Sequence, residues 1–442
     1  MSTGSACVHR SENGVLQGAC RCYMAGACGA SSAGGRWRRK QRSSNDGQVT
    51  ATAGWRGRNP TKAGPRFLIK YPVQREDGTK RVVLKRGFIT RKDAAAALRA
   101  EIRKVEMGEW VEPSKQRLDA YLAEWVQGQR LSPSTVSSYR KSIRLHIDPY
   151  LGAVPIARLT GTAVNAWMRT LATSGRADRR GGLSARTVRY VYTILRAALA
   201  DAVKHGRLSV NPTNRSTPPS PSEARPPEMQ AWTARELGRF LRWAEECDRD
   251  LAMSWRLLAA TGMRQGEALA LRWRDVDLEA GRLQVRRSVG VVKNKGLPEQ
   301  FLEGPTKTGQ ARVVNIDLDT VAALRTYRAD RGLLALDLVR DGALVLGNPD
   351  GTHRHPERYS RRFMEQVAQG RKALGEDLLP RIRLHDLRHT HATLLLAAGE
   401  PVKVVSERLG HASATITLTV YQHVHPGMGR QAADRFAALL RG

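Results

Sequence analysis

The chain has 442 residues, and its 73 Lys and Arg exceed its 41 Asp and Glu to give a net charge of +32. This excess favours a polyanionic partner, because each phosphate that a cationic side chain neutralises releases condensed counterions. No apolar run approaches the ~20 residues that span a bilayer, and the first 30 residues lack the apolar core of a secretory signal. These features exclude a membrane protein and predict a cytoplasmic location in contact with nucleic acid.

Residues 1–50 show no hydrophobic periodicity and are predicted to be a disordered tail. Four of the five cysteines lie within its first 28 residues, at Cys7, Cys20, Cys22 and Cys28. Their spacing matches no common zinc pattern such as paired C-x2-C, and the odd total argues against a disulfide framework. Whether this Cys-rich segment has a function stays open.

Residues 54–112 are predicted to form a small basic domain. Segments 67–71 and 81–84 have strand character around a hairpin turn signal, and 87–90 is the expected third strand. Thr90 should cap a helix over residues 92–107. Residues 36–115 hold 21 Lys and Arg against 8 Asp and Glu, a net +13. Such a sheet can lay its strands in a DNA groove, although a merely structural domain is the alternative.

Residues 116–210 are predicted to be entirely helical, because Leu118, Tyr121, Leu122 and Trp125 open the segment at helical spacing. The expected N-caps of the later helices are Ser132 for a helix through His146, Thr162 for a third helix, and Ser184 for the longest.

Residues 211–230 contain six prolines and should form an extended, exposed linker. Thr233 and Glu236 then form a capping box that opens the last domain, 231–442. This domain should contain helices to about residue 272, strands over 283–292 and 312–316, and helices to the end.

Six residues of the last domain form a chemical set. They are Arg264 in Ala-Thr-Gly-Met-Arg-Gln-Gly-Glu, Lys307 in Pro-Thr-Lys-Thr-Gly, His385 and Arg388 in His-Asp-Leu-Arg-His-Thr, His411 in Leu-Gly-His, and Tyr421 in Thr-Val-Tyr-Gln-His. Guanidinium groups fork onto phosphate oxygens and stay charged at physiological pH. A phenol surrounded by cations can attack phosphorus as the phenolate. The set therefore predicts an enzyme that cuts and rejoins DNA.

In order and context these motifs resemble those of the tyrosine recombinases, also called phage integrases. The resemblance implies a multidomain, mainly α fold with small β elements. Its parts would be a small sheet-plus-helix arm-type DNA-binding domain at 54–112, a helical, SAM-like core-binding domain at 116–210, and a mixed α/β, mostly α, catalytic domain at 231–442. It also implies a site-specific recombinase that integrates or excises a phage or mobile element, with no cofactor and no metal.

The chemistry assigns Arg264 and Arg388 to the nonbridging oxygens of the scissile phosphate. The resemblance implies that His385 helps to deprotonate Tyr421 and that His411 donates to a nonbridging oxygen. Lys307 would protonate the leaving 5′ oxygen. Tyr421 would become a 3′-phosphotyrosine, whose linkage keeps the bond energy, so that religation needs neither ATP nor metal.

The partners implied are double-stranded DNA at attachment sites and three further copies of the chain, as a homotetramer that passes through a Holliday junction. An excisionase and a DNA-bending host protein would be further partners, and the location would be the nucleoid. The apolar residues of the C-terminal segment, Ala432, Ala433, Phe436, Leu439 and Leu440, would pack either on a neighbouring protomer or in cis.

Several alternatives remain at the level of single residues. Lys293 and Lys295 compete with Lys307, and Tyr359 is the tyrosine with the most similar polar surroundings to those of Tyr421. His389 and His391 are expected to be structural or supporting. His385 and His389 have the spacing of a zinc pair, but the intervening Asp-Leu-Arg is unlike H-E-x-x-H and places an Arg beside the site.

Two other functions use similar residues. A type IB topoisomerase would apply the same chemistry without site dependence, and a non-catalytic DNA-binding regulator would retain the scaffold alone.

Overall fold

The computed structural model describes residues 48–52, 66–74, 78–108, 110–112, 114–178, 180–421 and 428–441. The chain divides into two compact units, Met1–Trp110 and Val111–Gly442. Almost all of the predicted tail, including its four cysteines, lies outside the described residues. Among the helices that are described, none combines the length and the apolar character needed to cross a membrane.

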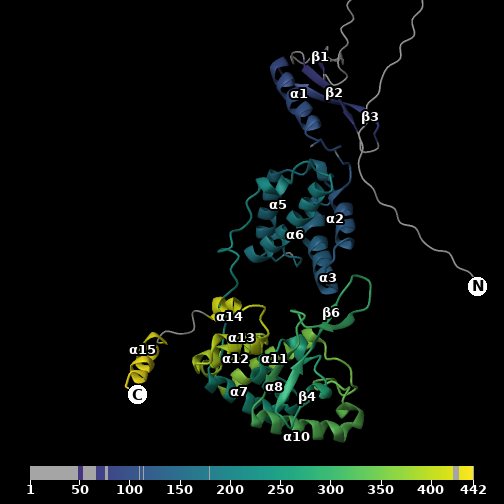
Figure 1. Cartoon of the computed structure of the whole chain (residues 1–442). Coiled ribbons are helices and arrows are strands. Elements are labelled where there is room, and N and C mark those ends of the chain that lie inside the picture. Colours follow the sequence, from purple (N-terminus) through teal and green to yellow (C-terminus); the bar gives the residue numbers. More distant parts are fainter. Residues whose placement is uncertain are drawn as a thin grey trace, which may run out of the picture. The chain divides into compact units, whose positions relative to one another are not determined.

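The first unit is an antiparallel three-stranded sheet with one helix against it (Figure 1). Its elements are β1 (Gln48–Thr52), β2 (Arg66–Gln74), β3 (Lys80–Phe88) and α1 (Arg91–Glu106). The buried contact consists of Ile69, Tyr71, Val73, Ala94 and Leu98. Thr90 caps α1 as predicted, since its side chain accepts a hydrogen bond from the backbone N–H of Asp93.

The third strand of this sheet differs from the prediction. Residues 87 and 88 continue β3, and the extra strand is β1, whose first three residues fall within the segment expected to be tail. Gly87 has a φ of 104° and lies where the β2–β3 register shifts, between Phe67 and Leu68. A glycine bulge bends this end of β3 rather than starting a new strand.

Residues 114–216 are helical, and the predicted helices are present. The elements are α2 (Leu118–Gln127), α3 (Pro133–Ser142), the π-helix η1 (Ile143–Ile147), α4 (Asp148–Leu151), the 3₁₀ helix η2 (Ile156–Arg158), α5 (Gly161–Ser174), α6 (Ala185–Lys204) and the 3₁₀ helix η3 (Pro212–Arg215). Ser132 and Ser184 cap α3 and α6 as predicted.

Three predictions in this part were wrong in detail. The cap of α5 is Thr160, which accepts from the backbone N–H of Ala163, so Thr162 lies inside the first turn. The helix from Pro133 continues past His146 through η1 and α4. The linker begins with η3 rather than with extended chain. Thr213 in η3 is buried, and its backbone N–H and hydroxyl donate hydrogen bonds to the Asn211 side chain.

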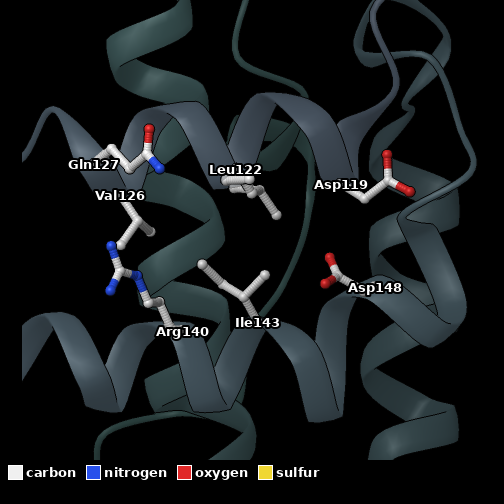
Figure 2. Close-up of a pocket in the computed structure, with 8 residues that line it drawn as sticks. Asp119, Leu122, Val126, Gln127, Arg140, Ile143 and Asp148 are labelled. Atoms are coloured by element: carbon white, nitrogen blue, oxygen red, sulfur yellow. The ribbon is translucent and has the colours of Figure 1, made fainter. Parts of the chain in front are cut away.

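A cavity of about 230 Å³ lies among these helices (Figure 2). Leu122, Val126 and Ile143 line it, and the carboxylates of Asp119 and Asp148 lie at one end. Burial, and then the charge of Asp119, raise the pKa of Asp148. Arg140 and Gln127 lie at the other end of the cavity, away from the two carboxylates.

Residues from 231 onward contain helices around a small sheet (Figure 1). The helices are α7 (Ala234–Cys247), α8 (Arg249–Thr261), α9 (Gln265–Ala268), η4 (Trp273–Asp275), α10 (Leu318–Leu334), η5 (Leu336–Val339), α11 (Pro356–Leu374), η6 (Glu376–Leu378), α12 (Asp386–Ala397), α13 (Val402–Leu409), α14 (Ala414–Tyr421) and α15 (Met428–Leu439). The strands are β4 (Val276–Asp277), β5 (Arg282–Val285), β6 (Arg287–Val292), β7 (Gln300–Pro305) and β8 (Arg312–Asn315).

The strand predicted over 283–292 is in fact two strands. β5 pairs with β4 and β8, whereas β6 forms a hairpin with β7, which was not predicted. The predicted capping box of Thr233 and Glu236 is present at the start of α7. An aromatic cluster of Trp232, Phe240, Trp255, Tyr359 and Phe363 fills the core. The mainly helical, multidomain fold was therefore predicted correctly.

Candidate active site

The C-terminal end of α8 collects three basic side chains. Its carbonyl oxygens accept hydrogen bonds from His391 Nδ1 at Ala259 (2.8 Å), from Arg408 Nη2 at Ala260 (2.8 Å) and from Arg388 Nη1 at Gly262 (2.7 Å). The end of a helix carries partial negative charge on its unpaired carbonyls, so cations are stabilised there. The sequence thus builds a buried anchor for Arg388, which is only 4% exposed.

Gly262 is the residue that allows this close approach. It ends α8 with a φ of +63°, and a Cβ atom there would lie 2.7 Å from both His391 Cδ2 and Leu409 Cδ2. A larger residue would therefore be strained by its backbone conformation and would also push α12 and α13 away.

Arg264 lies two residues further on, at the N-cap position of α9. Its Nη1 donates to Glu267 Oε1 at 2.8 Å, and its Nη2 donates to the carbonyl of Gly410 at 3.2 Å. The Glu267 side chain is fully buried, and it also accepts from Arg312 Nη2 at 2.7 Å. Although burial acts to raise the pKa of Glu267, Arg312 and Arg264 hold it below its ordinary value, so this carboxylate is ionised.

His385 is placed by the start of α12, where it is the N-cap residue. The buried carboxylate of Asp386 accepts two hydrogen bonds from the Arg383 guanidinium, at 3.0 and 2.9 Å, and fixes this end of the helix. Burial lowers the pKa of His385, and the positive charges of Arg388 and Arg264 lower it further. His385 is therefore a neutral imidazole beside two guanidinium groups.

His411 follows Gly410, which ends α13 with a φ of +65°. Burial, with the charges of Arg388 and Arg264, lowers the pKa of His411 to about 4. Its Nδ1 lies 2.8 Å from Oγ1 of Thr417, a buried residue of α14. The structure thus brings four of the predicted residues into one electrostatic neighbourhood: Arg264, His385, Arg388 and His411.

Lys307 is exposed, in the turn between β7 and β8. The turn is closed by the bond from the Thr306 hydroxyl to the Gln310 carbonyl, 2.7 Å, and by Gly309 with a φ of +73°. Within the described residues the Lys307 ammonium forms no hydrogen bond or ion pair. Its competitor Lys293 differs, because it pairs with Glu299 and Glu357 at 2.8 and 2.7 Å and these carboxylates raise the pKa of Lys293.

Residues 231–442 contain three tyrosines, at 327, 359 and 421. Tyr327 and Tyr359 are 6% and 3% exposed, and burial raises the pKa of both phenols. Tyr359 packs against Trp255 in the core and is not available to a substrate. Tyr421 is the last residue of α14, and its side chain lies outside the described part.

Comparison with known proteins identifies the family of this chain. Residues 232–428 match the model of the Phage integrase family, and residues 115–172 match that of the phage integrase N-terminal SAM-like domain. The integrase of Mycobacterium phage D29 is 28% identical over 367 residues, which cover 80% of this chain and 89% of that protein. The chain belongs to the phage integrase family. It is a tyrosine recombinase, an enzyme of site-specific DNA strand exchange.

Further matches include recombinases that are named for mobile elements. The ICEBs1 integrase of Bacillus subtilis (strain 168) is 26% identical over 311 residues, covering 70% of this chain and 78% of that protein. The fold resembles that of the Tn1549 transposon integrase in complex with a circular intermediate DNA, with a TM-score of 0.60 and 20% identity over 72% of this chain and 99% of that one. These matches do not favour the topoisomerase or the regulator.

Sequence reasoning missed two parts of the recombinase site. From the sequence, Glu267 is only a possible ion-pair partner of Arg264, and the Thr-Gly-Met-Arg-Gln-Gly-Glu context disfavours that pairing; the structure nevertheless contains the pair. Arg312 was not singled out. The three-residue spacing of Arg264 and Glu267 was a usable signal, whereas nothing local to Arg312 indicates that it reaches Glu267, 45 residues away. His391 is structural as expected, because Arg408 Nε donates to its Nε2 at 3.0 Å while its Nδ1 bonds Ala259.

Proposed function

We propose that this recombinase integrates and excises a phage or mobile element by a transesterification in which Tyr421 attacks the scissile phosphodiester. The reaction forms a bond between the phenolic oxygen and phosphorus and releases a 5′ hydroxyl. The observation that carries the proposal is the gathering of Arg264, Arg388, His385 and His411 from three separate segments around the end of α8.

Arg264 and Arg388 would bind the nonbridging oxygens of the phosphate. Both guanidinium groups are held on backbone carbonyls, Arg264 on Gly410 and Arg388 on Gly262, so their positions are set before DNA arrives. Donors fixed in advance stabilise the charge that develops in a pentacoordinate transition state without reorganisation.

The two histidines would handle protons and hydrogen bonds. As neutral imidazoles at pH 7, His385 can accept the phenolic proton of Tyr421, and His411 can donate to a nonbridging oxygen. The bond between His411 and Thr417 supports this geometry, because Thr417 and position 421 are one helical turn apart on α14 and share a face.

Lys307 would protonate the leaving 5′ oxygen. Its exposed position on a turn suits a group that reaches the DNA from outside the cluster. Because Lys293 is engaged by two carboxylates, it is a poorer candidate for this proton transfer.

The DNA would be bound by all three parts of the chain. We assign residues 54–112 to arm-type sites, where β3 exposes Lys80, Arg81, Lys85 and Arg86, residues 116–210 to the core site, residues 211–230 to the linker, and residues 231–442 to catalysis. Related proteins are known as DNA complexes, including a lambda integrase tetramer bound to a Holliday junction, with a TM-score of 0.50. By analogy four protomers would assemble at attachment sites in the cytoplasm, in association with the nucleoid, aided by an excisionase and a host DNA-bending protein.

The direct test is covalent trapping on a nicked suicide duplex that carries the element's attachment site. The wild-type chain should form an adduct with the 3′ phosphate at the break, and Tyr421→Phe should form none. Tyr150→Phe, at an exposed tyrosine of α4, is the control and should react normally. An adduct of unchanged yield with Tyr421→Phe would refute the proposal.

A further inference from the structure

Arg312 is a cationic residue of the site that none of the proposed chemical roles uses. It is the first residue of β8, five positions after Lys307, and its side chain is only 10% exposed. Its Nη2 donates to Glu267 Oε2 at 2.7 Å, and its Nε donates to the carbonyl of Arg408 at 2.9 Å. One guanidinium therefore joins β8, α9 and the last turn of α13.

The Arg408 carbonyl is close in sequence to the segment that carries His411. Gly410 lies between them, and a Cβ atom at Gly410 would lie 2.9 Å from Arg312 Nη1. The same glycine presents its carbonyl to Arg264. The backbone that holds both Arg264 and His411 is thus packed directly on the Arg312 guanidinium.

The buried carboxylate of Glu267 is shared by two cations. Its Oε1 accepts from the Arg264 guanidinium, and its Oε2 accepts from Arg312 and from the Arg264 backbone N–H. The group of three carries one net positive charge. Without Arg312, Oε2 would keep only the bond from the Arg264 backbone N–H and could draw a second donor of the Arg264 guanidinium, because a buried carboxylate is stabilised by each charged donor that it gains. Arg264 would then be neutralised by Glu267 rather than available to a phosphate.

We propose that Arg312 is a positioning residue for strand cleavage. Its bond to Glu267 Oε2 prevents Glu267 from binding both donors of the Arg264 guanidinium. Its bond to the Arg408 carbonyl holds the Gly410–His411 segment against β8. Because β8 begins just after the Lys307 turn, Arg312 also ties that turn to the corner where Arg264 and His411 lie. The proposal rests on the proposed function of Arg264 and His411, and it assigns Arg312 no contact with DNA.

The test compares Arg312→Gln, Arg312→Lys, Glu267→Gln and the double variant Arg312→Gln/Glu267→Gln on the suicide duplex at saturating DNA. We expect Arg312→Gln to lower the rate of adduct formation by about 10- to 100-fold, with the DNA dissociation constant within about twofold of wild type. Arg312→Lys should recover part of the rate, because it restores a charge to Glu267 without the second bond to Arg408.

The double variant separates positioning from mere structural support. Removing the Glu267 charge frees Arg264 again, so the double variant should cleave several-fold faster than Arg312→Gln alone. Arg312 is also one of the charges that lower the pKa of His411. The pKa of His411 should therefore rise in Arg312→Gln, as an NMR titration of its imidazole would measure, and a general loss of stability would not raise it.

Three results would overturn the proposal: an unchanged cleavage rate in Arg312→Gln, a double variant no faster than that single variant, or an unchanged pKa of His411. If Arg312→Gln fails to fold, the rate of Arg312→Lys decides instead: it should be several-fold below that of the wild type, because the bond to the Arg408 carbonyl is lost, and an unchanged rate would overturn the proposal. Loss of the adduct in Tyr421→Phe together with an unchanged rate in Arg312→Gln would leave the proposed function intact and remove only this inference.

Discussion

The cluster of Arg264, His385, Arg388 and His411 and the turn that carries Lys307 are held in place in opposite ways. Arg388 and Arg264 are bonded to backbone carbonyls at the ends of α8 and α13, and His411 is bonded to a buried threonine. Lys307 is exposed on a glycine-containing turn and, among the described residues, touches no carboxylate. The proposed reaction would thus use side chains with two very different degrees of restraint.

The difference follows from what each group would do. Binding a phosphate in its transition state rewards donors that are already in place, since reorganisation would cost part of the stabilisation. A general acid must instead meet a leaving oxygen whose position depends on the DNA, and then exchange its proton with solvent. In the proposed mechanism the anion-binding groups would accordingly be built into the core, and the proton donor would lie on the surface.

Removing a guanidinium from the cluster should have the largest effect. Arg388→Ala is expected to slow adduct formation on the order of 10³-fold or more, because a fixed charged donor to the phosphate is lost. DNA affinity should change little, since phosphate contacts elsewhere dominate binding. The measurement is a single-turnover cleavage rate, with Arg325→Ala on the exposed face of α10 as control. If the rate of Arg388→Ala stayed within tenfold of wild type, the fixed guanidinium would contribute no more to cleavage than the exposed lysine of the turn.

Lys307→Ala should slow cleavage less, by about 10²-fold. The loss should disappear on a duplex whose leaving 5′ oxygen is replaced by sulfur, because a thiolate leaves without protonation. Lys293→Ala and Lys295→Ala are matched controls from the neighbouring hairpin and should cleave both duplexes normally. If sulfur fails to rescue Lys307→Ala but rescues either control variant, the proton donor has been assigned to the wrong lysine.

Two glycines test the same contrast through stability. Gly262 and Gly309 both have positive φ, but a Cβ at Gly262 would meet His391 and Leu409, whereas a Cβ at Gly309 would meet nothing within 4 Å. Gly309→Ala should cost about 1–2 kcal/mol from backbone conformation alone. Gly262→Ala should cost about 2–4 kcal/mol, because overpacking is added. Urea unfolding measures both losses in the free energy of unfolding. Equal losses would show that the packing around Gly262 accommodates a Cβ atom as readily as the turn at Gly309.

The sequence predicted what depends on neighbours along the chain. Ser132, Ser184 and Thr233 cap helices where expected, since a side-chain acceptor three residues before a free N–H acts locally. The prediction of a single strand over 283–292 was wrong, because one apolar run can contribute strands to two sheets and no local signal separates β5 from β6.

The candidate site shows the same limit. Motifs indicated Arg388, but the carbonyl that holds it belongs to Gly262, 126 residues earlier in the chain. Likewise Arg312 becomes part of the site only because β8 brings it beside α13, which is a matter of tertiary packing rather than of sequence pattern.

Lowering the pH should reduce the free energy of unfolding through His391, which is bonded to the end of α8, whereas the Lys307 turn contains no histidine. Burial and the charge of Arg408 lower the pKa of His391 to about 4, whereas an unfolded histidine titrates near ~6.5. Between these two pKa values the unfolded chain binds more protons than the folded chain. The contribution of His391 to the free energy of unfolding is therefore fully present above about pH 6.5 and is lost as the pH falls toward 4. Each such histidine contributes a slope of at most about 1.4 kcal/mol per pH unit.

His391→Gln retains an acceptor for Arg408 but cannot titrate, so it should flatten this dependence by up to one proton, as urea unfolding at pH 7.5 and pH 5 would measure. Lys307→Ala provides the comparison, because it removes no histidine and should leave the slope as in wild type. An equal slope in His391→Gln and wild type would mean that this imidazole does not stay neutral in the fold. At pH 5 its Nε2 would then carry a proton and could not accept the hydrogen bond from Arg408.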